Sequence, residues 1–410
     1  MAFVSAAARD PSRDAAQEPW SGKAMAIVAL CFALNMADGM DLLVLSFIAP
    51  SLQNEWSVSP AQLAIVFSAG LAGMALGGLG VAPLADRFGR RRMVALAMGL
   101  MALAMVVSAY THSVAQLALV RFFVGTGIGT VLACIAAIAA RVAPRKHRNF
   151  AVGVLQAGYP IGAMLTGFIT AWALPLFGWR AILLGTAAVS ALMVPVILAV
   201  LPGGLDAGAS GQKTGIGEVI SGARRANSIR LWVAAICGFM ALYFITSWIT
   251  KLSIEAGLPQ TQAIIASAIY NFGAFAGTVA MSIAGTHYDV RRLCSVLLAA
   301  TAGVFLFFGG VSMPLWGVLI SAFVMGVTLQ GGFNMLYPLA AQVYPDAVRA
   351  TGIGWAFGIG RIGAFTGPLL GGWALGQHWP LVGIFALFCG PLLIAAASAV
   401  GVSRDGDAER

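Results

Sequence analysis

Two carboxylates lie three residues apart, at Asp38 and Asp41, inside an apolar run from about Ala24 to Pro50. The run is long enough to span a bilayer as a helix, and a carboxylate near its centre costs several kcal/mol unless it serves a function. The spacing of three places both acids on one helical face with Asn35. Two carboxylates so close in a low-dielectric medium cannot both ionise cheaply, which makes the pair a candidate proton carrier.

Two arginines, Arg121 and Arg361, also fall inside predicted membrane-spanning helices. Arg361 follows Arg349 by about twelve residues, which places it roughly 18 Å along a helix that rises about 1.5 Å per residue. Arg121 is expected nearer the outer third of its helix. Arginine keeps its proton in proteins, so neither residue can carry a coupled proton, but each can hold a carboxylate through two parallel hydrogen bonds.

This combination of acids and arginines suits a carrier of anions. Import of an anion against a potential that is negative inside costs about 2.3 kcal/mol per charge per 100 mV, so a coupled proton is needed to offset it. Our hypothesis is that Asp38 and Asp41 carry the proton, with Asp41 as the exchanging member. Arg361 would bind the substrate carboxylate, and Arg121 would pair with the acids. The alternative is a static network of ion pairs that locks the helices together.

Polar and aromatic residues near the predicted midplane could frame an aromatic ring and hydrogen-bond its hydroxyl. Gln330, Asn334 and Tyr337 share one face of the tenth predicted helix, and amides at that depth require a polar cavity. Four further residues could equally face lipid or a neighbouring helix. They are Tyr270, Asn271, Phe333 and Trp355.

The elements that must position these residues are membrane helices. Of the 410 residues, 60% are hydrophobic and 10% are charged, with 50 glycines, a balance that excludes a soluble globular domain of this size. The apolar runs predict an all-α membrane protein with twelve transmembrane helices. Their centres are expected near residues 37, 72, 101, 127, 161, 190, 240, 273, 302, 329, 362 and 390.

The basic residues set the expected orientation. A net charge of +9 could indicate a nucleic-acid partner, but the Lys and Arg residues follow the predicted loops instead of forming one patch. If both termini are cytoplasmic, the outside connections keep only Arg180 and Lys251. The positive-inside rule therefore predicts a multi-pass protein of the plasma (inner) membrane with both termini cytoplasmic. The expected partners are the lipid bilayer, protons and a small molecule, with no nucleic acid and no obligate protein partner.

The chain repeats itself at an offset of about 201 residues, so that Arg148 corresponds to Arg349 and Trp172 to Trp373. An even number of spans separates the copies, which indicates two six-helix halves arranged as parallel repeats. Such proteins place the substrate site between the halves near the bilayer midplane and rock one half against the other. The expected divisions are a cytoplasmic tail 1–22, an N-terminal bundle 23–201, a cytoplasmic linker 202–228, a C-terminal bundle 229–402 and a cytoplasmic tail 403–410.

Four motifs resemble known transporter sequences. The run Pro83–Arg91 resembles the loop between spans two and three of the major facilitator superfamily, and the run Arg121–Gly129 resembles its fourth-span motif. The run Asp38–Asp41 and the segment Arg349–Ala364 are similar to the narrower aromatic acid:H+ symporter family. The similarity extends from the first predicted span to the last.

The resemblance implies the major facilitator fold and a proton-coupled secondary active transporter. Such a protein imports a small aromatic carboxylate, such as a benzoate or a hydroxybenzoate, by alternating access. The resemblance implies the same roles for the first-span acids and the membrane arginines as our hypothesis does. It also implies that Asp86 helps to latch the halves on the cytoplasmic side. We therefore group Asp86 with its neighbours Arg87, Arg90 and Arg91 as a conformational or gating element.

Other functions are alternatives at this point. A proton-driven exporter of drugs or metabolites on the same fold is the closest one, although an exporter of cations has little use for Arg361. A membrane receptor for aromatic acids would need a signalling surface, and no substantial soluble domain is expected. The sequence shows no nucleophile with a base and no cluster of metal ligands, so we expect neither an enzyme nor a bound metal or cofactor.

Overall fold

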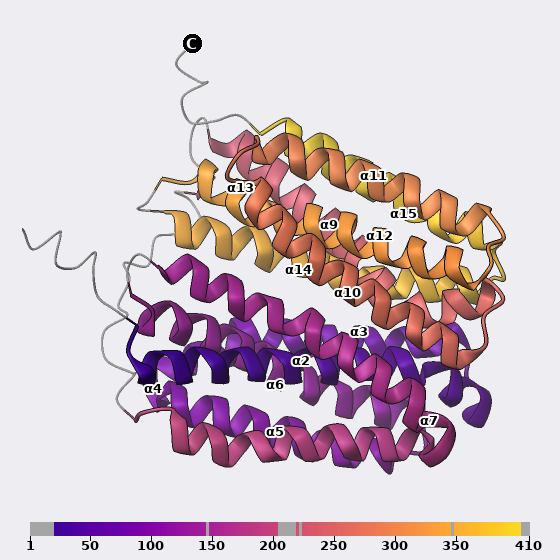
Figure 1. Ribbon diagram of the computed structural model, residues 1–410, viewed down its shortest axis with the longest axis horizontal. Helices are drawn as coiled ribbons and strands as arrows, with labels where there is room; N and C mark the ends of the chain where they lie inside the picture. The colour runs from indigo at the N-terminus through magenta and orange to yellow at the C-terminus, as the bar shows by residue number, and fades with distance from the viewer. Residues whose placement is uncertain (1–19, 145–146, 204–218, 221–223, 346–347, 403–410) are drawn as a thin grey trace, which may run out of the picture.

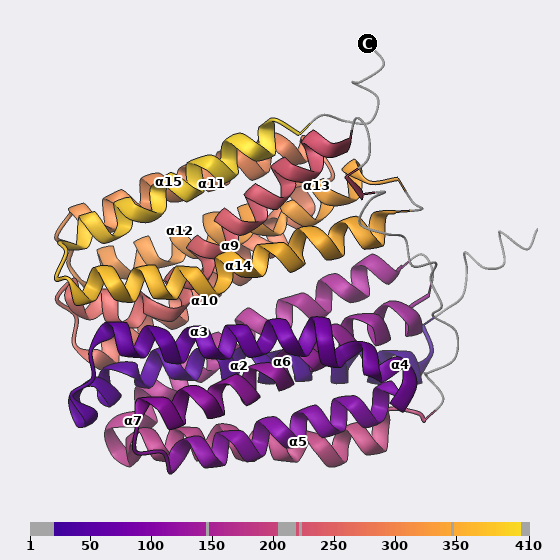
Figure 2. The same ribbon diagram turned by 180° about the vertical axis from the view of Figure 1, so that it is seen from behind.

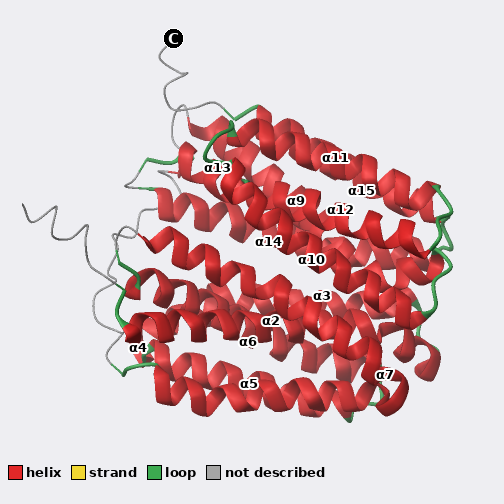
Figure 3. Ribbon diagram, viewed as in Figure 1, coloured by secondary structure: helices red, strands yellow, loops and turns green. Residues whose placement is uncertain are grey.

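The helices of this protein form two bundles that pack side by side, as Figure 1 and Figure 2 show from opposite directions. The computed structural model describes residues 20–144, 147–203, 219–220, 224–345 and 348–402. Within these ranges every regular element is a helix (Figure 3). Ten helices in the described part of the chain are long and apolar enough to cross a membrane. The predicted all-α membrane fold is therefore confirmed.

The first bundle holds the helices up to Val200. They are α2 (Gly22–Trp56), α3 (Pro60–Leu76), α4 (Ala85–Phe88), α5 (Arg90–Ala109), α6 (Val114–Val142) and α7 (Arg148–Val200). A π-helical turn η1 (Gly77–Val81) and a 3-10 turn η2 (Ala82–Leu84) join α3 to α4. The chain from Pro60 to Phe88 is therefore one continuous span.

The second bundle holds the helices from Arg224 onward. They are α9 (Arg224–Glu255), α10 (Gln260–Ala284), α11 (Val290–Gly310), α12 (Leu315–Asn334), α13 (Leu336–Val343), α14 (Arg349–Gly376) and α15 (Leu381–Val400). The short helix α13 continues the path of α12, so that Leu315–Val343 also forms one span. Figure 1 shows this bundle in orange and yellow above the indigo and magenta helices of the first.

Helix α7 contains two membrane-spanning segments. Its 53 residues would reach about 80 Å as a straight helix, more than twice the thickness of a hydrocarbon core. Gly178 interrupts it with φ 74° and ψ 170°, a conformation that glycine adopts but that strains other residues. The chain turns back there, at the bend near the α7 label in Figure 1. With α7 divided and the 28 residues of α14 included, the helices agree in position with the twelve predicted spans.

Local signals explain where two central helices begin. Ser59 accepts a hydrogen bond from the backbone N–H of Gln62, and the Gln62 side chain accepts one from the backbone N–H of Ser59. This reciprocal capping box is followed by Pro60 at the first helical position, where its missing N–H is no loss. Ser113 likewise accepts from the backbone N–H of Gln116 and caps α6. The caps therefore define the residues at which α3 and α6 begin.

Glycine contacts recur at equivalent places in the two bundles. A Cβ on Gly125 of α6 would collide with the carbonyl oxygen of Gly70 on α3. A Cβ on Gly326 of α12 would collide in the same way with the carbonyl oxygen of Tyr270 on α10. Gly125 and Gly326 are related by the offset of the sequence repeat. These close helix approaches require glycine, and their recurrence supports the parallel repeat.

The molecule has two ends, which we call the Trp56 end, where α2 ends, and the Arg90 end, where α5 begins. The predicted tails and most of the predicted linker fall outside the described residues. Those excluded are residues 1–19, 204–218, 221–223 and 403–410, together with 145–146 and 346–347. The boundaries proposed for the two bundles and the linker therefore stay predictions.

The bundles meet through α3 with α14 and through α7 with α10 (Figure 2). Among the described residues, the side-chain hydrogen bonds between the bundles lie from the middle of the molecule to the Trp56 end. The Ser46 hydroxyl donates to the backbone carbonyl of Ser247 at 2.8 Å, and the Gln260 amide donates to the Ser51 hydroxyl at 2.8 Å. The bundles are therefore joined more tightly at the Trp56 end than at the Arg90 end.

Candidate functional site

Asp38 and Asp41 lie midway along α2, where that helix is surrounded by α6, α7 and α9. Their exposed fractions are 1% and 0%. The predicted position of both acids in the middle of a membrane-spanning helix is therefore what the structure shows. Two carboxylates with so little contact with water must either be protonated or find polar partners.

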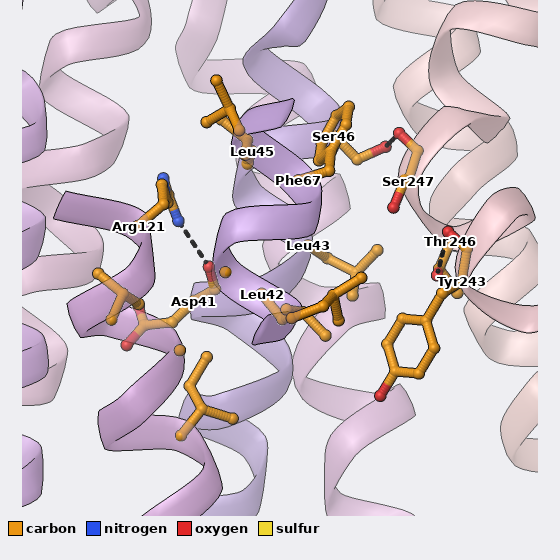
Figure 4. A pocket seen from close by; sticks show the side chains of 16 residues that line it. Asp41, Leu42, Leu43, Leu45, Ser46, Phe67, Arg121, Tyr243, Thr246 and Ser247 are labelled. Carbon is orange, nitrogen blue, oxygen red and sulfur yellow. Dashed lines mark hydrogen bonds between the residues drawn. The ribbon is translucent and has the colours of Figure 1, made fainter. Parts of the chain in front are cut away.

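Asp41 makes separate contacts through its side chain and its backbone. The Ser190 hydroxyl of α7 donates to Oδ2 of the Asp41 carboxylate at 2.8 Å, while Oδ1 has no partner among the described residues. Nη1 of Arg121 donates to the backbone carbonyl of Asp41 at 3.0 Å, the dashed line in Figure 4. The remaining guanidinium nitrogens of Arg121 have no partner in the described part of the chain. Arg121 thus approaches the acid without neutralising its carboxylate through a direct hydrogen bond.

Asp38 lies one helical turn from Asp41 and is less well satisfied. Neither oxygen of its carboxylate has a hydrogen-bond partner among the described residues. Asn35, on the same face, donates from its amide to the carbonyl of Leu155 on α7 at 2.6 Å. The Asp38 carboxylate therefore has unused hydrogen-bonding capacity for a proton or for a polar group of a ligand.

A small pocket beside Asp41 lies between the two bundles (Figure 4). The first bundle contributes Asp41, Arg121 and Phe67, and the second contributes Tyr243 and Thr246. The pocket offers about 30 Å³ to water-sized molecules. One water needs roughly 10–15 Å³ by this measure, whereas a cavity that holds benzene has about 150 Å³. In this arrangement the pocket has room for water but is too small for an aromatic ring.

Arg361 lies midway along α14 and is partly buried at the interface between the bundles. Its Nη1 donates to the hydroxyl of Tyr243 on α9 at 3.3 Å and to the sulfur of Met74 on α3 at 3.2 Å. Its guanidinium carbon lies 5.3 Å from the ring centroid of Phe239, in cation–π range. Tyr243 also lines the pocket beside Asp41, so it connects the two charged positions.

Aromatic rings gather next to Arg361 on the second bundle. The rings of Tyr337 and Phe357 stack at 3.8 Å with an angle of 6° between their planes. Phe333 packs against Phe239 with their centroids 4.6 Å apart. Tyr337 is 38% exposed, which shows that this group is open on one side. A cation beside flat apolar faces is the combination that binds an aromatic carboxylate.

The four charged residues do not form a network of ion pairs. The ion pairs between described residues join Asp86 to Arg90, Glu55 to Arg180, Glu255 to Lys251 and Asp289 to Arg291. None of these pairs includes Asp38, Asp41, Arg121 or Arg361. Their hydrogen bonds go to serine, tyrosine, methionine and backbone groups instead. This geometry disfavours a purely structural lock.

Several other predicted site residues make their hydrogen bonds elsewhere, or have no partner among the described residues. The Gln330 amide donates to Asn334 at 3.1 Å, and the Asn334 amide donates to the hydroxyl of Thr278 on α10 at 2.8 Å. Tyr270 is buried, and its hydroxyl has no partner among the described residues. Trp355 is 41% exposed. The substrate-binding roles of these residues stay predictions.

Asn271 is also buried on α10, where its amide donates to the carbonyl of Ser267 in the preceding turn at 2.8 Å. A bond within the same helix satisfies an amide without a ligand. Among the described residues, no side-chain hydrogen bond joins Asn271 to Asp41 or Arg361.

The predicted gating element lies at the Arg90 end, within the first bundle. Arg90 pairs with the exposed Asp86 at 3.3 Å, and Arg91 donates to the carbonyl of Leu198 at the end of α7. The Arg87 guanidinium lies 5.6 Å from the ring of Phe88. These three contacts lie within the first bundle, and the latch across the halves stays a prediction.

Sequence reasoning missed Ser190, Met74, Tyr243 and Phe239. Phe239 and Tyr243 are four residues apart and share a face of α9, a spacing that could have paired them. No sequence pattern singles out Ser190 or Met74. Ser190 is important through its contact with Asp41, and Met74 through its contact with Arg361, and each contact joins helices far apart in the sequence.

Comparisons with known proteins agree with this arrangement. The sequence profile described as Major Facilitator Superfamily matches residues 30–292. The "4-hydroxybenzoate transporter PcaK" of Pseudomonas aeruginosa is 29% identical over 93% of this chain and 93% of its own, and the "Gallate transporter" of Pseudomonas putida is 27% identical over 93% and 92%. A crystal structure of a D-xylose-proton symporter shares the fold, with a TM-score of 0.76 and 15% identity over 93% of this chain and 98% of the symporter. The resemblance to the superfamily and its aromatic acid branch is confirmed.

Proposed function

Because the chain belongs to the Major Facilitator Superfamily, we propose that it imports a small aromatic carboxylate together with protons by alternating access. Three lines support the proposal. Relatives that match nearly the whole chain are named as transporters of 4-hydroxybenzoate, gallate and benzoate. A cation lies beside aromatic rings between the bundles. Two acids are buried in the same region without ion-pair partners among the described residues.

Arg361 is the residue that carries the proposal for the substrate. Its guanidinium touches a thioether and a phenol hydroxyl, both weaker acceptors than a carboxylate, so an anionic substrate would improve its contacts. The stacked rings of Tyr337 and Phe357 and the ring of Phe239 supply flat apolar faces for the benzene ring. A substrate with a carboxylate on an aromatic ring satisfies both requirements.

Asp41 and Asp38 supply the proton sites of the proposal. The Ser190 hydroxyl can donate to an ionised Asp41 or accept from a protonated one, so the contact suits both states. One helical turn away, the two oxygens of Asp38 have no partner among the described residues. The two acids cannot both hold a negative charge cheaply at that depth. One proton moved with one carboxylate makes the translocated load neutral, so the membrane potential no longer opposes import.

The proposed location is the inner membrane, with both termini in the cytoplasm. Most of the described Lys and Arg residues of the connections lie at the Arg90 end, while Arg180 and Lys251 lie at the Trp56 end. The positive-inside rule then makes the Arg90 end cytoplasmic. With this orientation, the hydrogen bonds that join the bundles toward the Trp56 end support a state closed to the outside.

The experiment that tests this function is uptake of labelled 4-hydroxybenzoate by proteoliposomes. An inward proton gradient should drive accumulation, a protonophore should abolish it, and unlabelled benzoate and gallate should compete. If uptake reaches equilibrium and does not respond to the gradient, transport is not coupled to protons. Accumulation driven only by an outward gradient would favour the proton-driven exporter. No uptake and no competition, with protein shown to be folded, would overturn the assignment of aromatic carboxylates.

A further inference from the structure

Met74 lies at a position that neither the charges nor the family motif single out. It is 4% exposed in the middle of the molecule, near the end of α3, and it belongs to the first bundle. Its sulfur accepts from Nη1 of Arg361 at 3.2 Å and from the Tyr243 hydroxyl at 3.9 Å. Both donors belong to the second bundle. One thioether therefore accepts polar contacts from two residues of the opposite bundle.

A thioether is an unusual partner for a partly buried guanidinium. Sulfur of this kind is a weak acceptor, whereas carboxylate oxygens bind arginine in short, charge-assisted pairs. The chain has buried carboxylates at Asp38 and Asp41, but neither takes this place. A carboxylate at position 74 would hold Arg361 permanently. The contact in the structure is instead weak enough to be exchanged.

We propose that Met74 is an internal placeholder ligand, which occupies Arg361 in the closed arrangement and is displaced by the carboxylate of the substrate. The inference rests on the proposed function, because it assumes an anionic substrate at Arg361. Met74 therefore sets substrate affinity through competition. A stronger acceptor at this position weakens binding, and a side chain without an acceptor strengthens it.

The placeholder also couples binding to motion. The contact of Met74 with Arg361 and Tyr243 crosses from α3 to α14 and α9, so its loss removes polar contacts between the bundles. A bound carboxylate performs this exchange without leaving the guanidinium unsatisfied. When substrate leaves, the thioether returns and spares the arginine an unpaired state. The bundles can then rock in both the loaded and the empty condition.

The test compares Met74→Leu with Met74→Gln. Leucine keeps the volume and removes the acceptor, and glutamine adds a stronger one. The probe is labelled 4-hydroxybenzoate bound at equilibrium to detergent-solubilised protein, which requires no proton gradient. We expect the Kd to fall about three- to tenfold in Met74→Leu and to rise by a similar factor in Met74→Gln. Met105→Leu, a fully buried methionine on α5, is the matched control and should leave the Kd unchanged.

A second arm separates competition from altered packing. In an Arg361→Lys background the opposite effects of leucine and glutamine should disappear, because the shared guanidinium is gone. Equal Kd values for wild type, Met74→Leu and Met105→Leu would overturn the placeholder while leaving the proposed function intact. A change in the same direction for leucine and glutamine would also overturn it. Absence of any binding by folded wild-type protein would instead reject the proposed function, and the placeholder with it.

Discussion

Asp41 is held through its backbone by one partner and through its carboxylate by another. Arg121 donates to the backbone carbonyl, and Ser190 donates to the side chain. Since the guanidinium is not bonded to the carboxylate, the acid can gain or lose a proton without breaking an ion pair. A hydroxyl can reverse its role between donor and acceptor when the protonation state changes. The arrangement suits a residue that must titrate during each cycle.

Substitution of this acid separates coupling from translocation. In Asp41→Asn we expect substrate exchange between the two sides of the membrane to persist, because an amide can still contact Ser190. Gradient-driven accumulation should be lost, whereas each coupled proton gives the wild type about tenfold accumulation per pH unit. Labelled counterflow and uptake under an imposed gradient measure the two activities. Glu55→Gln, which removes a carboxylate at the Trp56 end of the same helix, should accumulate substrate. Full coupling in Asp41→Asn would refute the role of Asp41.

Arginine at position 361 should not be replaceable by lysine. Lysine keeps the charge but loses the planar pair of donors and the cation–π geometry over Phe239. We expect Arg361→Lys to raise the KM for 4-hydroxybenzoate at least about tenfold, because hydrogen bonds to charged groups contribute roughly 1.5–3 kcal/mol. Initial uptake rates over a range of substrate concentrations give the KM. An unchanged KM would place the carboxylate elsewhere. Arg180→Lys, at the Trp56 end, is the charge-matched control.

The sequence was enough to find the ionisable part of this site, and not the rest. Asp38, Asp41 and Arg361 stand out because each interrupts an apolar run, which has a large energetic cost. Ser190 and Met74 are unremarkable in their own helices. Their importance arises from contacts with Asp41 and Arg361, and tertiary packing alone determines such contacts.

At the scale of helices, backbone contact at glycine decides which surfaces meet. Gly125 allows α6 to touch the backbone of α3, and α6 carries Arg121 toward α2. The positions of the spans followed from the apolar runs, since a membrane imposes a minimum helix length. Which helices lie side by side did not follow, because small residues occur throughout the chain and only some of them meet a neighbour.

A larger residue at Gly125 should destabilise the first bundle. A Cβ there would overlap the carbonyl oxygen of Gly70, so Gly125→Val must push α6 away from α3. Overpacking of this kind costs about 1–3 kcal/mol, and we expect the Tm in detergent to fall by several degrees. Gly185→Val is the matched control, because nothing lies within 4 Å of a Cβ at that position. Equal melting temperatures for the two variants would contradict the packing argument.

At the scale of the whole molecule, the Trp56 end is closed by the meeting of α3 with α14. A Cβ on Gly372 would lie 2.5 Å from the Cβ of Ala64 and 2.9 Å from the carbonyl oxygen of Pro60. These contacts cross between the bundles. One helical turn further, a Cβ on Gly376 would come no closer than 3.9 Å to the Cβ of Ala61. The two positions therefore differ in whether a side chain fits while this end is closed.

A larger side chain at position 372 should change the balance between arrangements that are closed and arrangements that are open at the Trp56 end. We expect Gly372→Val to favour arrangements open at the Trp56 end, whereas Gly376→Val should not. Labelling of Ser51→Cys by a membrane-impermeant maleimide, in a chain without its native cysteines, measures access from that side. Faster labelling in Gly372→Val alone is the expected result. Equal labelling in both variants would mean that the contact of α3 with α14 does not control access.

The hydrogen bond from Ser46 to Ser247 has a meaning beyond closure, because these positions are 201 residues apart, the spacing of the internal repeat. A contact between equivalent positions lies on the axis that exchanges the halves. In an isologous dimer each subunit presents the same patch, so residues on the axis face their own copies. The contact between the bundles toward the Trp56 end thus has the geometry of a homodimer interface within one polypeptide. This is expected if an ancestral gene was duplicated and the two copies were fused. Fusion then freed the two halves to diverge, leaving Asp41 on one side and Arg361 on the other.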